Sequence, residues 1–413
     1  MVPPPVLTEA IRLMRTATTL WPGFTPATIP ALVFDGGVTW LDGAAPQDDG
    51  WEEVGDRWRF PGCHPALNAN TAVTLPGGAL AAGVLLPSLG EADAVTVASI
   101  LLHEAFHVYQ RAHPRPAWQA DELAALTYPA TDPEVLHARA EETQALADAL
   151  SAADWVPHAR RALHWRQVRS DRLTPEHRTF EARMETAEGL AEYVETRFLG
   201  TFPPMDATDA ARMNARQWAY HTGAALAHLL RRSGADWMEA VEGGTPLHAQ
   251  LGKLVGPPAT PLQPTPPQPT PALRHAAEVA AHTHTESLRR LEATFAAQPG
   301  ERLTVTSAAG FPVTALDPMN VTRLDGTHFP HACFLHTRFL SLNLGADGTF
   351  RLSGASALTH GPGLWRPTAV EVRGLPLPET SGGRWVVQDD RWTIQLPADR
   401  VQSTPDGWRC RLD

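Results

Sequence analysis

Residues 99–109 read Ser-Ile-Leu-Leu-His-Glu-Ala-Phe-His-Val-Tyr, and this stretch decides how the rest of the chain is interpreted. It carries the pattern His-Glu-x-x-His inside an apolar run typical of a buried helix. Residues i and i+4 share one face of a helix, so the imidazoles of His103 and His107 can reach one tetrahedral zinc ion. Glu104 lies beside the first histidine, where it can take a proton from zinc-bound water. The pattern therefore predicts one zinc ion per chain, against the alternative of two histidines on an ordinary helix.

Two histidines do not complete a catalytic zinc site, which takes three protein ligands and leaves a fourth position for water. The best further candidate is Glu188, 81 residues after His107, in the segment 184–193 that reads METAEGLAEY. Glu185 is an alternative ligand. A third interpretation is a solvated acidic helix face, because five glutamates recur at helical spacing, although a bound cation or facing histidines and arginines would relieve their repulsion. These are Glu181, Glu185, Glu188, Glu192 and Glu195.

The two motifs together resemble the glutamate zincins, the peptidase MA group that includes thermolysin and aminopeptidase N. In that group a later helix carries a glutamate ahead of a small residue, which corresponds here to Glu188 before Gly189. The resemblance implies that Glu188 is the third zinc ligand and that Glu192, four positions later, orients a ligand histidine without touching the metal. It covers about residues 90–250 and implies a zincin-like fold that hydrolyses peptide bonds in peptides or proteins. The 81-residue separation is longer than in thermolysin or aminopeptidase N, which implies inserted helices.

The predicted mechanism is attack of zinc-activated water on a carbonyl, with Glu104 as the general base that later returns the proton to the leaving amine. The oxyanion formed on the way needs a hydrogen-bond donor, usually a tyrosine or a histidine. Our candidate is Tyr220, because aminopeptidase N-like enzymes place a tyrosine downstream of the third-ligand helix. A simply packed aromatic ring is the competing interpretation of Tyr220, and His221 is a weaker donor candidate. No motif in the sequence distinguishes an endopeptidase from an exopeptidase.

The apolar pattern predicts an α+β chain, with a zincin-like, mostly helical catalytic domain, a small N-terminal antiparallel sheet and a β-rich C-terminal domain. The sheet is expected from four short apolar runs separated by turn residues. The stretch from Gly77 to Leu86 is placed either to pair with an extended substrate as an edge strand or to form a plain core hairpin. From residue 92 to about 250 the pattern is helical, broken at prolines. The four apolar runs are 29–34, 38–41, 72–75 and 79–86.

Proline density marks the boundary between the predicted domains. We assign 1–255 to the zincin-like metallopeptidase domain and 256–272, where prolines are crowded, to a linker or loop. The helix predicted at 273–298 is expected to pack on the catalytic domain, and 299–413 to form the β-rich domain. Hairpin turns are predicted in that domain at 345–348 and 389–390.

The composition excludes several classes of partner. Lys and Arg number 34 against 45 Asp and Glu, a net charge of −11 with no basic cluster, so neither nucleic acid nor an anionic membrane surface is an expected partner. The three cysteines are too scattered for a disulfide framework and fit free thiols. The N-terminus lacks the pattern of a secretory signal, and the longest apolar run, 94–102, is too short to span a bilayer. We therefore expect a cytoplasmic protein of undetermined oligomeric state.

Two other functions are compatible with the same motifs. One is a catalytically silent zincin-fold binding protein that uses the C-terminal β domain for recognition. Retention of Glu104 argues against this function, because a structural zinc has no use for a general base. The other is a structural zinc site closed by a fourth protein ligand, which bound water visible at the metal would exclude.

Overall fold

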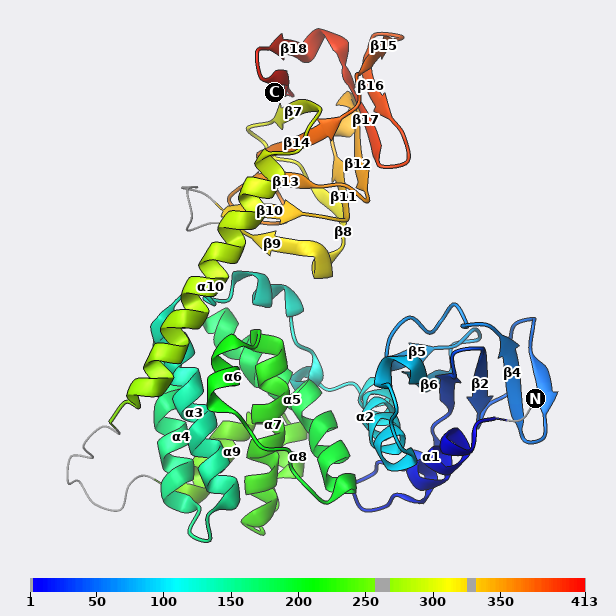
Figure 1. Cartoon of the computed structure of the whole chain (residues 1–413), viewed down its shortest axis with the longest axis vertical. Helices are drawn as coiled ribbons and strands as arrows, with labels where there is room; N and C mark the ends of the chain where they lie inside the picture. Colours follow the sequence, from blue (N-terminus) through cyan, green and yellow to red (C-terminus); the bar gives the residue numbers. More distant parts are fainter. Residues whose placement is uncertain (1–2, 257–267, 325–331, 413) are drawn as a thin grey trace. The chain divides into compact units, whose positions relative to one another are not determined.

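The computed structural model describes residues 3–256, 268–324 and 332–412. Its internal contacts divide the chain into two compact units: unit 1 comprises 1–122 and 132–278, and unit 2 comprises 123–131 and 279–413. Unit 1 is mostly helical with one sheet, and unit 2 is mostly strand with two sheets, so the predicted α+β character is confirmed (Figure 1). Among the described residues, no helix has the length and apolar character needed to cross a membrane.

Unit 1 contains one six-stranded sheet with the strand order β3-β4-β2-β1-β6-β5. The predicted antiparallel sheet is corrected in one respect, because β1 and β6 pair in parallel while the other neighbours are antiparallel. The chain forms β2 to β5 before β6 returns beside β1, a crossover that local apolar runs do not reveal. The strands are β1 (Ala31–Phe34), β2 (Val38–Asp42), β3 (Glu52–Val54), β4 (Arg57–Pro61), β5 (Thr71–Thr74) and β6 (Leu80–Leu85).

Alternate side chains of the central strands enter two different cores. Val33 and Trp40 are fully buried in the main core of unit 1, together with apolar residues of α1 (Pro5–Thr16) and α2 (Ala94–Ala112). Their neighbours, including Leu32, lie in a smaller core on the opposite face, as the period of two along a strand requires. Figure 1 shows α2 running alongside the sheet. The sheet therefore fixes the position of the helix that carries the His-Glu-x-x-His motif.

Most of the remaining helices of unit 1 begin at or near prolines or hydrogen-bonding caps. Proline is the first residue of α3 and α5 and the second residue of α4, positions where its missing N–H costs nothing. The central helix α5 packs on α2 and α7. The helices are α3 (Pro133–Ser151), α4 (Val156–Ser170), α5 (Pro175–Leu199), α6 (Ala207–Arg212), α7 (Ala215–Arg232), α8 (Met238–Glu242) and α9 (Leu247–Val255), with short 3-10 turns before and between them.

Two glycines set the distance between α5 and α7. A Cβ atom added to Gly189 would lie 2.6 Å from the Cα of Gly223, and one added to Gly223 would lie 2.9 Å from the Cα of Gly189. No side chain fits in that space, so the two backbones touch. This contact brings the residues on α7 next to the glutamates on α5.

Helix α10 (Pro271–Ala296) corresponds to the helix predicted at 273–298, but it is divided between the units after Glu278. In unit 2 its residues Leu288 and Phe295 are buried in one cluster with residues of the strands, which is where they find apolar partners. From the sequence, this whole helix is expected to pack on the catalytic domain. In the structure, its residues after Glu278 belong to unit 2. Most of the predicted linker at 256–272 lies outside the described residues.

Unit 2 is built from two sheets that share one apolar core, contributed by strands of both. The seven-stranded sheet has the order β18-β19-β7-β14-β13-β10-β9, and the six-stranded sheet β15-β16-β17-β12-β11-β8. Both predicted hairpins are present, as β11–β12 and β16–β17. The strands are β7 (Glu301–Thr306), β8 (Val313–Leu316), β9 (Val321–Arg323), β10 (Ala332–His336), β11 (Phe339–Asn343), β12 (Thr349–Ser353), β13 (Ala357–Gly361), β14 (Ala369–Leu375), β15 (Glu379–Ser381), β16 (Arg384–Gln388), β17 (Trp392–Pro397), β18 (Val401–Thr404) and β19 (Gly407–Arg411).

Candidate metal centre

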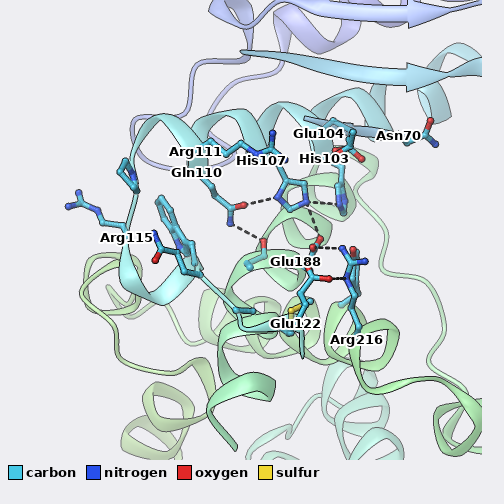
Figure 2. A pocket seen from close by; sticks show the side chains of 18 residues that line it. Asn70, His103, Glu104, His107, Gln110, Arg111, Arg115, Glu122, Glu188 and Arg216 are labelled. Atoms are coloured by element: carbon cyan, nitrogen blue, oxygen red, sulfur yellow. Dashed lines mark hydrogen bonds and ion pairs between the residues drawn. The ribbon is translucent and has the colours of Figure 1, made fainter. Parts of the chain in front are cut away.

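Helix α2 presents the two histidines of the motif to one cavity. The helix is capped by Asp93, whose carboxylate accepts a hydrogen bond from the N–H of Thr96. Its apolar residues face the core, whereas His103 and His107 line the cavity. Their Nε2 atoms are 3.2 Å apart. Figure 2 shows the two rings turned toward each other. The i, i+4 spacing therefore has the effect predicted for it.

The orientation of His107 is set by Gln110, a residue that the sequence analysis did not select. The amide nitrogen of Gln110 donates to the carbonyl oxygens of Thr186 (3.3 Å) and Ala187 (2.9 Å), so its Oε1 is left to face Nδ1 of His107 at 2.8 Å (Figure 2). An amide oxygen can only accept, so Nδ1 carries the proton. In the neutral ring, Nε2 then holds a lone pair directed into the cavity.

The orientation of His103 is set by Glu195 in the same way. Oε2 of Glu195 lies 3.1 Å from Nδ1 of His103, and a carboxylate accepts the proton of that nitrogen. Burial lowers the pKa of His103, but the hydrogen bond to Glu195 and the charges of Glu104 and Glu188 more than offset it, so the pKa is raised. Because Glu195 holds the proton on Nδ1, the neutral ring of His103 also presents the lone pair of Nε2 to the cavity.

Glu188, on α5, is the third member of the group. Its Oε2 lies 3.1 Å from Nε2 of His107, and its Oε1 accepts a hydrogen bond from Arg216 at 3.0 Å. Burial raises the pKa of this carboxyl, but a protonated His107 and interactions with Tyr220 and Arg216 bring it well below its usual range, so the group is ionised. Donor atoms of the two histidines and Glu188 all lie within 4.8 Å of one another, as a shared metal ion requires.

The role predicted for Glu192 belongs to Glu195. Glu192 accepts a hydrogen bond from Nδ1 of His221 at 2.8 Å, and the ligand histidine His103 is bound by Glu195. At 100° per residue, Glu192 is rotated about 40° from Glu188 in one sense and Glu195 about 20° in the other. Glu192 therefore faces α7, and Glu195 faces α2. His221, the weaker candidate for the oxyanion donor, is the partner of Glu192 and is not among the residues that line the cavity.

Glu104 is buried beside the three candidate ligands, with 6% of its surface exposed. Its Oε2 has no hydrogen-bond partner within the described part of the chain. Burial raises the pKa of Glu104, the two histidines lower it and neighbouring carboxylates raise it, with a net rise. An unpartnered buried carboxylate oxygen of this kind is available to a molecule that enters the cavity.

Tyr220 lines the same cavity from α7. Its ring stacks on that of His103, with the ring centroids 6.0 Å apart, and its side chain interacts with Glu188. Burial and the charge of Glu188 raise the pKa of Tyr220, so the phenol keeps its proton. Tyr220 is therefore not simply a packed aromatic ring, because its hydroxyl brings a hydrogen-bond donor to the candidate centre.

The cavity around the centre has a volume of about 660 Å³, within the range usual for small-ligand sites. Its walls come from α2, α5, α7, the start of β5 and the segment after α2. Further lining residues that the sequence analysis did not select include Asn70, Arg111, Arg115, Trp118, Glu122 and Arg216. Gln110 could have been found, because three residues after His107 the helix returns to the same face, whereas Arg216 carries no signal in the sequence.

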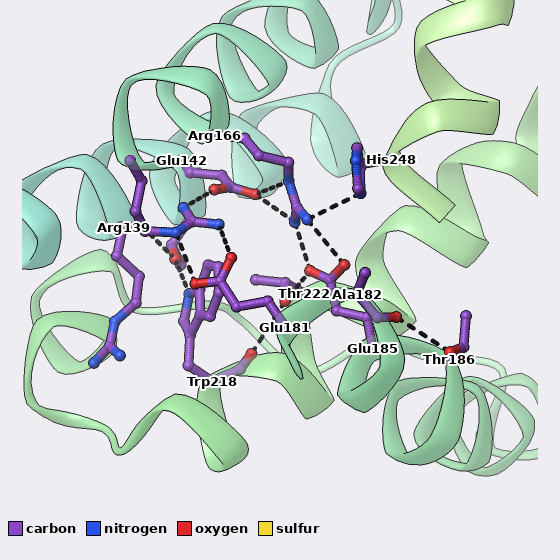
Figure 3. Close-up of polar contacts among 12 residues, drawn as sticks. Arg139, Glu142, Arg166, Glu181, Ala182, Glu185, Thr186, Trp218, Thr222 and His248 are labelled. Carbon is purple, nitrogen blue, oxygen red and sulfur yellow. Dashed lines mark hydrogen bonds and ion pairs between the residues drawn. The ribbon is translucent and has the colours of Figure 1, made fainter. Parts of the chain in front are cut away.

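The N-terminal part of the acidic stripe on α5 has a different environment (Figure 3). Arg169 binds Glu181 through Nε and NH2 at 3.0 and 2.9 Å, and Arg166 binds Glu185 at 2.9 Å and Glu142 at 2.8 Å. All five side chains are nearly inaccessible to solvent. The interpretation of the stripe as a solvated face is therefore wrong, and Glu185 is committed to an arginine, away from the histidines.

Comparison of the chain with protein-family models, with curated proteins and with solved structures gave no match. What can be said of the site therefore rests on its own geometry. That geometry defines a class of site, a candidate metal centre with two histidines and one glutamate beside a buried, unpartnered carboxylate oxygen.

Proposed function

We propose that unit 1 is a zincin-like metallopeptidase that hydrolyses peptide bonds with one zinc ion held by His103, His107 and Glu188. The observation that carries this proposal is the convergence of three electron-pair donors. Gln110 and Glu195 hold the Nδ1 atoms of the two histidines, so both Nε2 atoms present lone pairs to the point that Glu188 also faces. A bound cation would stabilise donors held this close together.

The donor set suits zinc in a catalytic setting. Two imidazole nitrogens and one carboxylate oxygen are a known ligand set of catalytic zinc. Within residues 3–256, 268–324 and 332–412, no fourth His, Cys, Asp or Glu joins the group, so a position is left for water or substrate. A zinc ion bound here would lower the pKa of water toward ~7 and polarise a substrate carbonyl.

Glu104 is the proposed general base. Its raised pKa, due first to burial, makes it a better proton acceptor than an exposed glutamate. We assign its unpartnered Oε2 to take a proton from the attacking water and to return it to the leaving amine. Tyr220, which keeps its proton, is the proposed hydrogen-bond donor to the oxyanion.

The test is metal content and peptide cleavage for the wild type beside Glu104→Gln and Glu188→Ala. We expect the wild type to bind one zinc ion and to cleave casein or a peptide library. Glu104→Gln should keep the metal and lose at least about a hundredfold in kcat, because it removes the base and leaves the ligands. Glu188→Ala should lose both metal and activity, because it removes a ligand.

Two results would contradict the proposal. A wild type that binds zinc but cleaves no peptide, with Glu104→Gln behaving identically, would favour the catalytically silent binding protein. A wild type that cannot be loaded with zinc would contradict the assignment of His103, His107 and Glu188 as metal ligands.

A further inference from the structure

The strand β5 (Thr71–Thr74) is an edge of the sheet of unit 1, and it borders the cavity. The sheet ends at β5, and β6 lies between β1 and β5, so the edge strand expected from Gly77 to Leu86 is in fact the inner strand of the hairpin. Asn70 and Thr71 line the cavity. An edge strand beside a binding site is a template on which an extended polypeptide can pair.

The outward-facing backbone groups of β5 belong to Ala72, next to the cavity-lining Thr71, and to Thr74, two residues further on. Ala72 lies directly opposite Ala82 in the antiparallel pair of β5 and β6. The N–H of Ala82 donates to the carbonyl of Pro30 at 2.8 Å, on the far side of β6. Directly opposed residues either exchange both hydrogen bonds or neither, so Ala72 directs its own N–H and C=O away from the sheet.

The outward carbonyl of Ala72 is already bonded. NH1 of Arg111 donates to it at 2.5 Å, and Ala72 itself is 2% exposed. Arg111 stands one helical turn after His107 on α2 and is one of the residues that line the same cavity (Figure 2). An extended substrate that paired with this edge would have to displace a charged hydrogen bond, one of the stronger kinds in proteins.

On the side of Ala72 away from the cavity, Thr74 is the one residue of the strand that also directs its backbone groups outward. The strand is four residues long and Pro76 follows in the turn. At its other end, the side chain of Asn70 accepts a hydrogen bond from the N–H of Leu85 at 2.8 Å and so continues the pairing with β6. Short, covered edges of this kind are how sheets avoid pairing with other chains.

We propose that Arg111 is a specificity-determining residue, which excludes extended polypeptides from the edge of β5 and restricts the site to short peptides held by the side chains of the cavity. This inference rests on the proposed peptidase function. It concerns substrate length, which no motif in the sequence addresses.

The experiment compares two fluorogenic peptides that share the same cleaved bond, one of three residues and one of ten. The readout is the ratio of their kcat/KM values in the wild type and in Arg111→Met, which keeps the alkyl stem and removes the guanidinium. We expect the wild type to prefer the short peptide and Arg111→Met to raise the long-to-short ratio about tenfold or more, because one charged hydrogen bond no longer competes with the substrate. An unchanged or lower ratio would overturn the proposal. Arg111 is exposed, so its replacement does not threaten folding.

Two matched variants separate this effect from the loss of a charge or of an arginine–carbonyl bond. Arg115→Met removes one positive charge from the same cavity, and Arg178→Met removes a bond from an arginine to a carbonyl, that of Ser170, elsewhere in unit 1. We expect the long-to-short ratio to stay as in the wild type for both. A rise in either variant equal to that of Arg111→Met would overturn the assignment to the edge of β5.

A binding measurement keeps this inference distinct from the proposed function. In a Glu104→Gln background, calorimetry should show the ten-residue peptide binding about tenfold more tightly when Arg111 is also replaced by Met. If the wild type cleaves neither peptide, the proposed hydrolysis fails, and this comparison alone decides the role of Arg111. Equal binding with and without the guanidinium would then count against it.

Discussion

Helix α5 carries two groups of buried glutamates that differ in their partners. In its first half, Glu181 and Glu185 are held by the guanidinium groups of Arg169 and Arg166. One turn later, Glu188 faces His107, beside a cavity, with the unpartnered oxygen of Glu104 nearby. The first group is paired with arginines inside the protein, whereas Glu188 of the second group borders a cavity together with a carboxylate oxygen that has no partner among the described residues.

The difference lies in which cation answers each carboxylate. A guanidinium is always charged and has no lone pair to offer, so the arginine pairs can only be structural. An imidazole loses its proton near neutral pH and then binds a metal. The comparison teaches that an acidic stripe on a helix is informative only together with the residues that face it. Its two halves should respond differently to substitution, and the predictions below test that difference.

The largest expected effect is in the arginine half. Arg169→Met leaves Glu181 and Glu142 buried without their full complement of charge, and removal of one partner from a buried ion pair costs about 3–5 kcal/mol. Arg169 also lies over the ring of Trp218, with its guanidinium carbon 4.3 Å from the centroid, so packing is lost as well. Urea unfolding should show the loss, whereas zinc bound per folded molecule should not change.

The control for Arg169→Met is Arg12→Met, which breaks the exposed pair of Arg12 with Glu9 and should leave the free energy of unfolding nearly unchanged. If Arg169→Met costs no more than this control, the two halves of α5 do not differ in the way described.

An intermediate effect is expected in the histidine half. Gln110→Met removes the acceptor that holds the proton on Nδ1 of His107, so Nε2 is no longer reserved for metal. Loss of such a supporting contact typically weakens metal binding by about 10–100-fold. Competition with a chelator measures the affinity, and ¹⁵N NMR of the metal-free protein reports the His107 tautomer.

The matched control for Gln110→Met is Gln250→Met, which replaces another buried glutamine of unit 1 outside the cavity. Its zinc affinity should equal that of the wild type. Equal affinities in all three proteins would show that Gln110 is a packing residue only.

The smallest effect concerns pH. Burial and the nearby charge of Arg166 lower the pKa of His248 to about 3, whereas the unfolded chain has its ordinary value near 6.5. The unfolded state therefore binds a proton that the folded state does not, so stability present above pH 6.5 is lost as the pH falls toward 3. Between pH 7 and 5 we expect a loss of roughly 1–2 kcal/mol from this partly exposed group.

His248→Gln should flatten that slope in urea unfolding of the metal-free protein at pH 7 and 5. Without metal, pH-dependent metal binding contributes to neither slope. A slope as steep as in the wild type would mean that acid sensitivity arises elsewhere in the molecule.

Local patterns allowed much of this arrangement to be predicted. Helical spacing brought His103 and His107 to one face, and turn residues marked both predicted hairpins of unit 2. These features depend on residues close together in the sequence. The short strand β3 was missed because it has a single apolar residue, whereas β4 does alternate charged and aromatic residues from Arg57 to Phe60, a signal that the sequence analysis overlooked.

What the sequence did not reveal depends on how elements rotate against one another. Glu192 and Glu195 both lie within about 40° of Glu188 on α5, and only the positions of α2 and α7 decide which of them meets His103. The parallel pairing of β1 with β6 likewise depends on a crossover between distant segments. Such choices arise from tertiary packing, which spacing along the chain does not encode.

The contact between Gly189 and Gly223 has a consequence for which substitutions the molecule can tolerate. Because the backbones of α5 and α7 touch there, no residue larger than glycine fits without parting the two helices. Separation of the helices would move Glu188 away from Tyr220. Glu188 is next to Gly189 in the sequence, and Tyr220 is three residues before Gly223. In a library of random variants, alanine at either glycine should therefore be depleted as strongly as substitutions at the histidines, although neither glycine offers an atom to the chemistry.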